Sequence, residues 1–419
     1  MNGPQPTLYR PLRPASSRFV RVRGLDYHVL AWDAPSSTGA PPIVLLHGWM
    51  DVGASFQFVV DALQGTALAG RAVFAPDWRG FGLTQPPEPT DSYWFPDYLG
   101  DLDALLPALA GDSSSVDLVG HSMGGNIVMS YAGVRPARVR RLVNLEGFGM
   151  PRTEPRHAPK RLVQWLDSLA EPQRLKDYAS LDEVADRLRK NNPRLSEDKA
   201  RWLAPHWAVR RDGDGDGRDG NARFHILGDP AHKRPNPVLY RVDEILETWK
   251  LIAAPTLWVE AADSQPEQWW GGRYSRSEFH ERLNVVPNVE RRILTDCGHM
   301  LHHDQPQALA EGLAAFLATE AEKEQGPGAA GPHSPPGGVQ PASTGVGRCR
   351  PSAWRARSAP RSPAARGVPY CRWPVPCSRE AQRRRPPRRA HAAPAAPPGS
   401  PAPCGRRRRR AVLHVGQSP

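Results

Sequence analysis

The chain has 419 residues and a formal net charge of +12. Residues 325–419 hold 18 arginines and one acidic residue, Glu380, so the remaining chain, with 37 basic and 42 acidic residues, is mildly acidic. This distribution argues against a body that binds nucleic acid through its charge. No apolar run approaches the roughly 20 residues of a membrane-spanning helix. Cys297 is the one cysteine outside the tail, which argues against a disulfide framework and favours a reducing, cytoplasmic location.

Residues 1–18 contain no apolar core of a signal peptide, so we expect a flexible N-terminus. The next two segments, FVRVRG and DYHVLAWD, predict an opening β-hairpin that turns at Gly24. Six later segments predict buried strands: PPIVLLHG, RAVFAPD, VDLVGHS, RLVNLEG, PTLWVEA and VERRILTD. Most are continuous apolar runs, which are typical of strands covered by helices on both faces.

Helical patterns fill the intervals between these strands. Apolar positions recur at helical spacing between Tyr93 and Leu109, and again between Leu309 and Leu317. The alternation of strands and helices predicts the α/β class, with a mostly parallel central sheet flanked by helices. We expect this core to comprise residues 19–149 and 251–320.

Residues 150–250 interrupt the alternation. Helical segments such as KRLVQWLDSL and LDEVADRLRK take over, followed by a turn-rich stretch. An insertion between two strands of one parallel sheet lies at the carboxyl ends of the strands, where ligands bind in such folds. We therefore predict an inserted helical cap above a site.

The C-terminal segment 321–419 is rich in arginine, proline and alanine. Residues 325–419 hold 19 of the 46 prolines and almost no aliphatic runs, so we expect the tail to be disordered. Its four cysteines match no zinc-binding spacing. Three interpretations stay open: a translation of GC-rich DNA in an unselected frame, a tail that binds polyanions, and an inert linker.

The pattern G-x-S-x-G occurs at Gly120, Ser122 and Gly124, after the strand VDLV and before a run compatible with a helix. A sharp strand-to-helix turn needs small residues on both sides of its central residue, because that residue is held in a strained conformation that exposes its side chain. The motif therefore predicts that Ser122 is a nucleophile.

A serine hydroxyl needs a base within hydrogen-bond reach and a third group that orients the base. His299 follows the last predicted strand and precedes the last helix, which is the place of the base in the chain order Ser, acid, His. Asp263, after the strand PTLWVEA, is our first choice of acid. Glu146 is the alternative, because a carboxylate at the end of RLVNLEG can also reach the histidine. We expect Glu260 to point along the other face of its strand.

A tetrahedral intermediate needs N–H donors that are already in place for its oxyanion. One donor is expected to be the backbone amide of Met123, directly after the nucleophile. The other is expected in the loop HGWMD, where Trp49 supplies the amide, Gly48 permits close approach and His47 supports the loop.

Four motifs together resemble the α/β-hydrolase superfamily, in its esterase, lipase and epoxide-hydrolase-like branch with a helical cap: HGWMD, PDWRGFGLT, GHSMGG and GHMLHHDQP. The resemblance covers about residues 19–318. It implies that the second motif is structural, through Asp77, Arg79, Gly80 and Gly82.

The sequence departs from this family at two places. Thr84 replaces the usual serine of the second motif, and Val259 and Glu260 stand where glycine is usual before the acid. Haloalkane dehalogenases and epoxide hydrolases of the family carry aspartate at the elbow, so Ser122 argues against both chemistries.

These residues predict a serine hydrolase that cleaves a small carboxylic ester or related acyl substrate, with no cofactor and no metal. The same three residues also serve carbon–carbon bond hydrolases, lactonases, thioesterases and cofactor-free haloperoxidases, which stay open as alternatives. A binding protein or receptor of the same fold is the alternative outside catalysis. We expect neither a specific nucleic-acid partner nor a membrane partner, and the sequence leaves the oligomeric state open.

Overall fold

The computed structural model describes residues 8–34, 39–112, 114–211 and 222–325. The predicted disorder of residues 321–419 falls mostly on 326–419, which lie outside the described residues. The described residues end with a short helix, α12 (Glu320–Gln325), which covers the first residues of the segment predicted to be disordered. None of the described helices is both long enough and apolar enough to cross a membrane.

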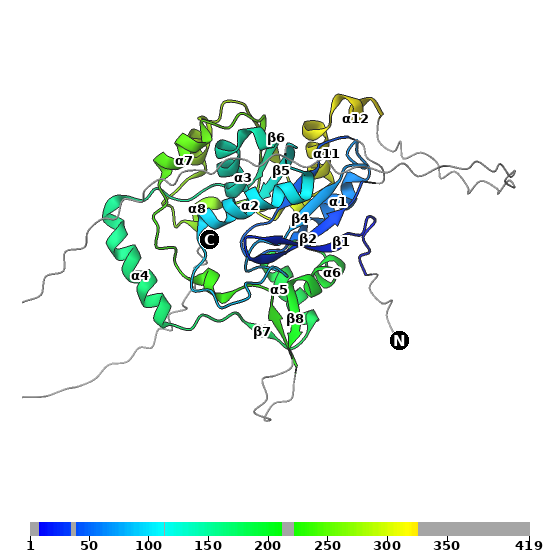
Figure 1. The fold of residues 1–419 in the computed structure, drawn as a ribbon. Coiled ribbons are helices and arrows are strands. Elements are labelled where there is room, and N and C mark those ends of the chain that lie inside the picture. Colours follow the sequence, from blue (N-terminus) through cyan, green and yellow to red (C-terminus); the bar gives the residue numbers. More distant parts are fainter. Residues whose placement is uncertain (1–7, 35–38, 113, 212–221, 326–419) are drawn as a thin grey trace, which may run out of the picture. The chain divides into compact units, whose positions relative to one another are not determined.

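An eight-stranded sheet lies at the centre of the fold and confirms the predicted mostly parallel sheet (Figure 1). Its strands are β1 (Ser16–Val22), β2 (Leu25–Trp32), β3 (Ile43–Leu46), β4 (Val73–Pro76), β5 (Val116–His121), β6 (Val139–Leu145), β10 (Thr256–Ala261) and β11 (Val289–Leu294). Their spatial order is β1-β2-β4-β3-β5-β6-β10-β11. Strand β2 is antiparallel to both of its neighbours, and the remaining pairs are parallel.

Strand β3 shows why the predicted strands are apolar throughout. All four of its residues are buried, and they alternate between two cores, with Ile43 and Leu45 in one and Val44 and Leu46 in the other. A strand with helices on both faces has no solvent-facing side. The edge strand β11, VERRIL, is the contrast, because none of its residues is buried.

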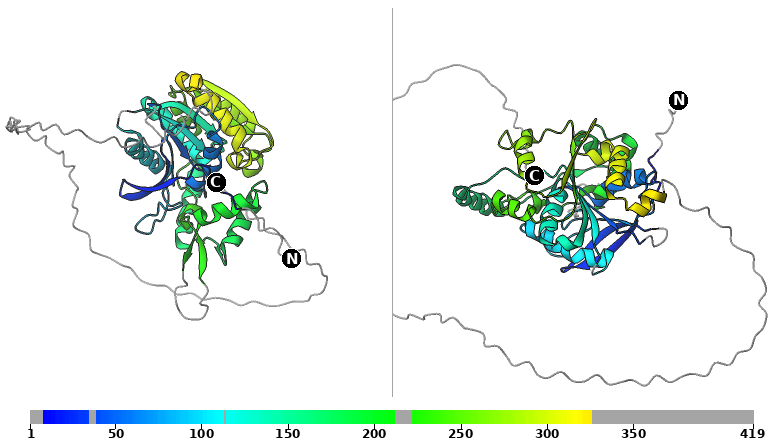
Figure 2. Two further views of the ribbon diagram at one scale, coloured as in Figure 1. Left: turned by 90° about the vertical axis from the view of Figure 1, so that its right-hand side faces the viewer. Right: turned by 90° about the horizontal axis from the view of Figure 1, so that it is seen from above.

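Helices cover both faces of this sheet (Figure 2). One core receives apolar side chains from α1 (Gln57–Leu63) and α11 (Pro306–Leu317), which pack against each other. The other receives side chains from α2 (Phe95–Ala110), α3 (Met123–Val134) and α9 (Arg276–Leu283). Shorter helices join these elements: η1 (Gly53–Phe56), η2 (Pro136–Arg138), α8 (Pro266–Trp269) and α10 (Leu301–Asp304).

The insertion between β6 and β10 contains strands as well as the predicted helices. Its elements are η3 (Pro155–His157), α4 (Ala158–Ala170), β7 (Asp177–Tyr178), α5 (Leu181–Asn191), α6 (Glu197–Trp207), β8 (Ala208–Arg211), β9 (Arg223–Ile226), η4 (Pro230–Lys233) and α7 (Val242–Trp249). Strands β7, β9 and β8 form a small antiparallel sheet. They have only two to four residues each, and only Tyr178 and Ala208 are buried, so they lack the apolar pattern that identifies a strand.

Backbone hydrogen bonds join the insertion to the PDWRGFGLT segment. The amide of Gly82 donates to the carbonyl of Leu227 at 2.8 Å, and the amide of Asp229 donates to the carbonyl of Gly80 at 2.7 Å. The last helix of the predicted cap range, α7, packs against α3 of the core, and its Trp249 is buried there.

Part of the segment predicted as flexible, residues 1–18, is instead held on the core. The backbone amides of Leu12 and Arg13 donate to the two carboxylate oxygens of Asp61 at 2.9 and 3.0 Å, and Tyr9 donates to the same carboxylate. Asp61 lies on α1, so the chain from residue 9 onward is anchored before β1 begins.

A fully buried ion pair connects the amino-terminal ends of the central strands. Arg71 precedes β4 and contacts Asp117 on β5 at 2.5 Å, and both side chains are completely shielded from solvent. Arg140 on β6 is a second, partly exposed partner of the same carboxylate. Removing one member of a buried pair leaves an uncompensated charge, which is far more costly than loss of an exposed pair.

We predict that Asp117→Ala lowers the free energy of unfolding by about 3–5 kcal/mol, because Arg71 then loses its fully buried carboxylate and keeps only Glu322, which lies farther away at 3.4 Å and is partly exposed. Urea denaturation followed by circular dichroism measures the change. The control is Asp26→Ala, which removes the exposed pair with Arg21 and should change the value by at most about 0.5 kcal/mol. Equal effects of the two substitutions would contradict the prediction.

Candidate active site

Ser122 lies at the sharp turn between β5 and α3, with φ 51° and ψ −113°. A positive φ is strained for a residue with a side chain, and the neighbouring strand enforces it. The amide of Ser122 donates to the carbonyl of Leu145 at the end of β6, at 2.8 Å. Its own carbonyl accepts from the amide of Asn126 at 3.1 Å. The predicted strand–serine–helix arrangement is therefore present at the carboxyl edge of the sheet.

The glycines around Ser122 allow α3 to approach the sheet closely. A Cβ atom at Gly120 would lie 2.3 Å from the carbonyl oxygen of Gly124, and one at Gly124 would lie 2.2 Å from that of Leu46. A Cβ atom at Gly125 would lie 2.2 Å from Oδ1 of Asn144. Because most of these obstacles are backbone atoms, no side-chain movement could make room for a larger residue.

His299 and Ser122 meet as the sequence predicts. Nε2 of His299 lies 3.0 Å from Oγ of Ser122, and Nδ1 lies 3.2 Å from Oε2 of Glu146. An ionised carboxylate only accepts hydrogen bonds, so Nδ1 carries the imidazole proton and Nε2 presents its lone pair to the serine hydroxyl. This is the tautomer that a general base requires.

Glu146 is held firmly although it follows the end of β6 with a φ of 59°. Its side chain is completely shielded from solvent, and Oε1 accepts from the amide of Ala261 at 2.8 Å. The side chain of Asn144 closes the turn by accepting from the amide of Gly147 at 2.9 Å. The carboxylate therefore has one oxygen fixed by the sheet and the other directed at His299.

Asp263, the first choice of acid from the sequence, does not face His299. Its carboxylate pairs with Arg194 of the insertion at 2.7 Å, and its side chain is 50% exposed. Its amide donates to the carbonyl of Cys297 at 3.1 Å, which fixes the loop in this position. Glu260 points elsewhere, as expected, and pairs with Arg276 and with His280.

The predicted oxyanion loop is supported by His47, which is completely buried. Its Nε2 accepts from the amide of Trp78 at 2.8 Å, so the proton is on Nδ1, which donates to the carbonyl of Gly48 at 2.7 Å. Burial lowers the pKa of His47 and keeps it neutral in this role. A Cβ atom at Gly48 would lie 3.1 Å from Cβ of Ser122, so this loop passes directly beside the elbow.

The two expected oxyanion donors belong to segments next to Ser122: Met123 follows it directly, and Trp49 follows Gly48, whose backbone passes beside it. Met123 is the first residue of α3, and the first amides of a helix have no acceptor within the helix. The positive end of the helix dipole adds to their attraction for an anion. Trp49 follows Gly48 in the loop after β3, and both Trp49 and Met123 are partly buried.

Two residues beside His299 were not among the sequence predictions. His121, the last residue of β5, donates from Nε2 to the carbonyl of His299 at 2.8 Å. The rings of Trp269 and His299 make a T-shaped contact, with ring centroids 4.4 Å apart. His121 stands inside the GHSMGG motif and could have been noticed there, whereas nothing in the sequence around Trp269 indicates this contact.

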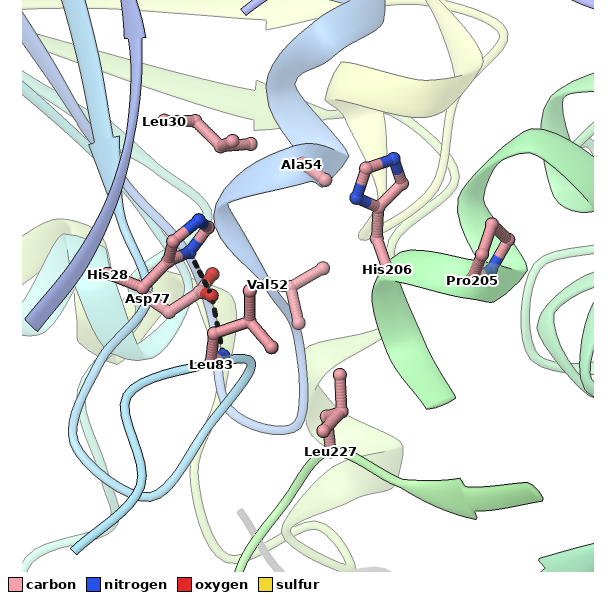
Figure 3. A pocket seen from close by; sticks show the side chains of 9 residues that line it. All are labelled: His28, Leu30, Val52, Ala54, Asp77, Leu83, Pro205, His206 and Leu227. Carbon is pink, nitrogen blue, oxygen red and sulfur yellow. Dashed lines mark hydrogen bonds and ion pairs between the residues drawn. The ribbon is translucent and has the colours of Figure 1, made fainter. Parts of the chain in front are cut away.

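A cavity of about 60 Å³ lies between the core and the insertion (Figure 3). It is lined by the hydrogen-bonded pair His28 and Asp77 and, from α6, by His206. Neither Ser122 nor His299 lines it. Ligand pockets commonly exceed about 300 Å³, so this cavity has room for water and not for an ester substrate.

A family model described as alpha/beta hydrolase fold matches residues 41–306. The chain belongs to this family. A serine hydrolase-like protein of Danio rerio is 25% identical over 288 residues, which cover 66% of this chain and 81% of the relative. Epoxide hydrolase 2 of Siraitia grosvenorii is 37% identical over 127 residues, which cover 30% of this chain and 37% of the relative. The solved thioesterase domain from the curacin biosynthetic pathway is similar with a TM-score of 0.60 and 25% identity, covering 72% of this chain and 99% of the domain.

We predict that Glu146→Gln lowers the rate at which Ser122 of this alpha/beta hydrolase reacts with a fluorophosphonate probe by about 10³-fold or more, because the charge that stabilises the imidazolium is lost. The matched control is Asp263→Asn, which should leave the rate within about twofold, since Asp263 pairs with Arg194. Probe fluorescence after gel separation measures both rates. If Asp263→Asn instead reacted much more slowly than Glu146→Gln, Asp263 and not Glu146 would be the acid.

Proposed function

We propose that the protein is a serine hydrolase that cleaves a small carboxylic ester, or a related acyl substrate, through an acyl-enzyme on Ser122. One observation carries the proposal: Nε2 of His299 lies 3.0 Å from Oγ of Ser122, while Nδ1 faces the buried carboxylate of Glu146. A hydroxyl, a base and an orienting anion in this order are the parts that acyl transfer requires.

In the first half of the reaction, Oγ of Ser122 attacks the substrate carbonyl carbon while its proton moves to Nε2 of His299. Glu146 stabilises the imidazolium that forms, and the backbone amides of Met123 and Trp49 donate hydrogen bonds to the oxyanion of the tetrahedral intermediate. The intermediate collapses, the bond to the leaving oxygen breaks, and His299 returns its proton to that oxygen. An alcohol leaves and the acyl group stays on Ser122.

In the second half, His299 removes a proton from a water molecule, and the hydroxide attacks the carbonyl of the acyl-enzyme. The second tetrahedral intermediate uses the same amides. When it collapses, Oγ of Ser122 leaves and takes the proton back from Nε2. A carboxylic acid is released and the enzyme regains its starting state.

The serine argues against epoxide opening in this chain. Attack by a serine alkoxide on an epoxide carbon would form an ether, which water cannot cleave under mild conditions. A carboxylate nucleophile would form an ester, which can be hydrolysed. Ser122 therefore suits substrates that already contain an acyl carbonyl.

A thioester is the second candidate substrate. The similarity to a thioesterase domain at 25% identity and a TM-score of 0.60 favours it. The bond-breaking steps are the same, except that the leaving group is a thiolate. A thiolate is a weaker base than an alkoxide, so its departure depends less on a proton from His299. A direct comparison of matched oxygen esters and thioesters separates the two classes.

We predict that Ser122→Ala and His299→Ala each lower kcat/KM for p-nitrophenyl esters by about 10⁴-fold or more, because each removes a group that reacts or transfers a proton. The measurement uses acyl chains of rising length, together with the corresponding thioesters. The control is Ser264→Ala, whose buried hydroxyl has no hydrogen-bond partner among the described residues and should not affect turnover.

Thermal melting of each variant shows whether the fold is kept. Wild-type protein that hydrolyses none of these esters or thioesters would contradict the proposal. So would residual activity in Ser122→Ala equal to that of Ser264→Ala.

A further inference from the structure

Three ionisable side chains meet in the interior directly behind the elbow. Asp51 comes from the loop after β3, His121 from the end of β5 and His302 from α10. Their side chains are buried, with residue exposures of 4%, 2% and 0%. One oxygen or ring nitrogen from each lies within 4.8 Å of the other two. We refer to these three residues as the Asp51 cluster.

The atoms that meet there have no hydrogen-bond partner in the described part of the chain. These atoms are Oδ2 of Asp51, Nδ1 of His121 and both ring nitrogens of His302. Nε2 of His302 lies 3.6 Å from Oδ2 of Asp51, which is within ion-pair range if the imidazole is charged but too long for a hydrogen bond. Buried polar atoms are almost always paired, so a group of unpaired ones needs a specific explanation.

The surrounding contacts show that two of these atoms present lone pairs and not protons. His121 donates its Nε2 proton to the carbonyl of His299, so in the neutral ring Nδ1 carries a lone pair. Oδ1 of Asp51 accepts from the amide of Val52 at 2.9 Å and from the hydroxyl of Ser55, which leaves Oδ2 free. An anion and an imidazole lone pair that lie within 4.8 Å of each other in the interior are stabilised by a cation between them.

We propose that Asp51, His121 and His302 bind a divalent transition metal ion, with zinc as the reference case. Two imidazoles and one carboxylate are a common zinc ligand set, which leaves a fourth position for water. The contacts outside the cluster fit this role. The N–H of His121 is held by a backbone carbonyl, and Asp51 is fixed by two donors, as is usual around metal ligands.

Binding requires a modest contraction of the Asp51 cluster. Zinc bonds of about 2.0–2.1 Å place tetrahedral ligands roughly 3.3–3.4 Å apart, so the pair at the upper limit of 4.8 Å must approach by about 1.5 Å. Asp51 lies in a loop and His302 on a four-residue helix, so two of the three ligands belong to short elements.

Zinc binding can be measured without any assay of activity. Wild-type protein is purified from zinc-supplemented culture for elemental analysis, and is also stripped with a chelator and titrated with zinc in a calorimeter. We expect one zinc per chain in both preparations. Cobalt in place of zinc should give the visible absorption bands of a four-coordinate site.

The variants His302→Phe and Asp51→Asn should weaken zinc binding at least about 100-fold, since each removes one of three ligands. Asp51→Asn retains an oxygen for Val52 and Ser55, so it tests the ligand with little change in the loop. The matched control is His303→Phe. His303 is also buried with an unpaired Nε2, yet it is not part of the Asp51 cluster, so its loss should leave zinc binding within about twofold.

Absence of bound zinc in the wild type would overturn the proposal, and a proton or water would then fill the space. Equal weakening in His303→Phe, or unchanged binding in both ligand variants, would also overturn it.

A consequence for catalysis rests on the proposed function. The ring centroids of His121 and His299 are 4.8 Å apart. A divalent cation bound to His121 would therefore disfavour the positive charge that forms on His299 during the reaction. We expect saturating zinc to slow ester hydrolysis about tenfold in wild type and His303→Phe, but not in His302→Phe. If no ester is hydrolysed, the proposed function fails while the binding measurements still decide the metal site. Zinc binding without any inhibition would overturn this coupling alone.

Discussion

The close approach of α3 to the sheet is the constraint on which the site depends. Ser122 can adopt its positive φ only because the residues around it have no side chains that would meet the backbone of Leu46 and Gly124. The turn directs the hydroxyl to the carboxyl edge of the sheet, where the loop after β11 brings His299. The same turn places the first amides of α3 next to Ser122, so in the proposed mechanism one strained residue positions both the attacking oxygen and the helix end that would bind an anion.

The acid illustrates what the sequence could not decide. Parallel strands β6 and β10 are neighbours, and both end at the same edge, so Glu146 and Asp263 start from similar positions. The choice between them depends on the direction of each side chain. Asn144 and Gly147 close a turn that sends Glu146 toward His299, while Arg194 of the insertion draws Asp263 outward. An ion pair between residues 69 positions apart has no signature in the sequence.

The parts of the fold that were predicted share a physical cause. Strands covered on both faces must be apolar, and α3 must be preceded by small residues, so β3, β5 and the elbow are visible in the sequence. The parts that were missed depend on single contacts. Residues 9–13 are ordered by the carboxylate of Asp61, and the small sheet β7-β9-β8 consists of short strands without an apolar face. Such contacts form only when the chain packs into its tertiary structure, and they leave no periodic pattern of apolar residues in the sequence.

Three separate contacts determine the position of His299. Glu146 contacts Nδ1, His121 holds the backbone carbonyl, and Trp269 borders the ring. Because His121 binds the main chain, the loop keeps its place even when the acid is altered. In the proposed mechanism the role of Glu146 is therefore mainly electrostatic, because it selects the tautomer and stabilises the charge of the imidazolium. His121 consequently connects the base to the interior, since its other nitrogen faces Asp51 and His302. Any charge that enters that space acts on His299 across a single imidazole ring.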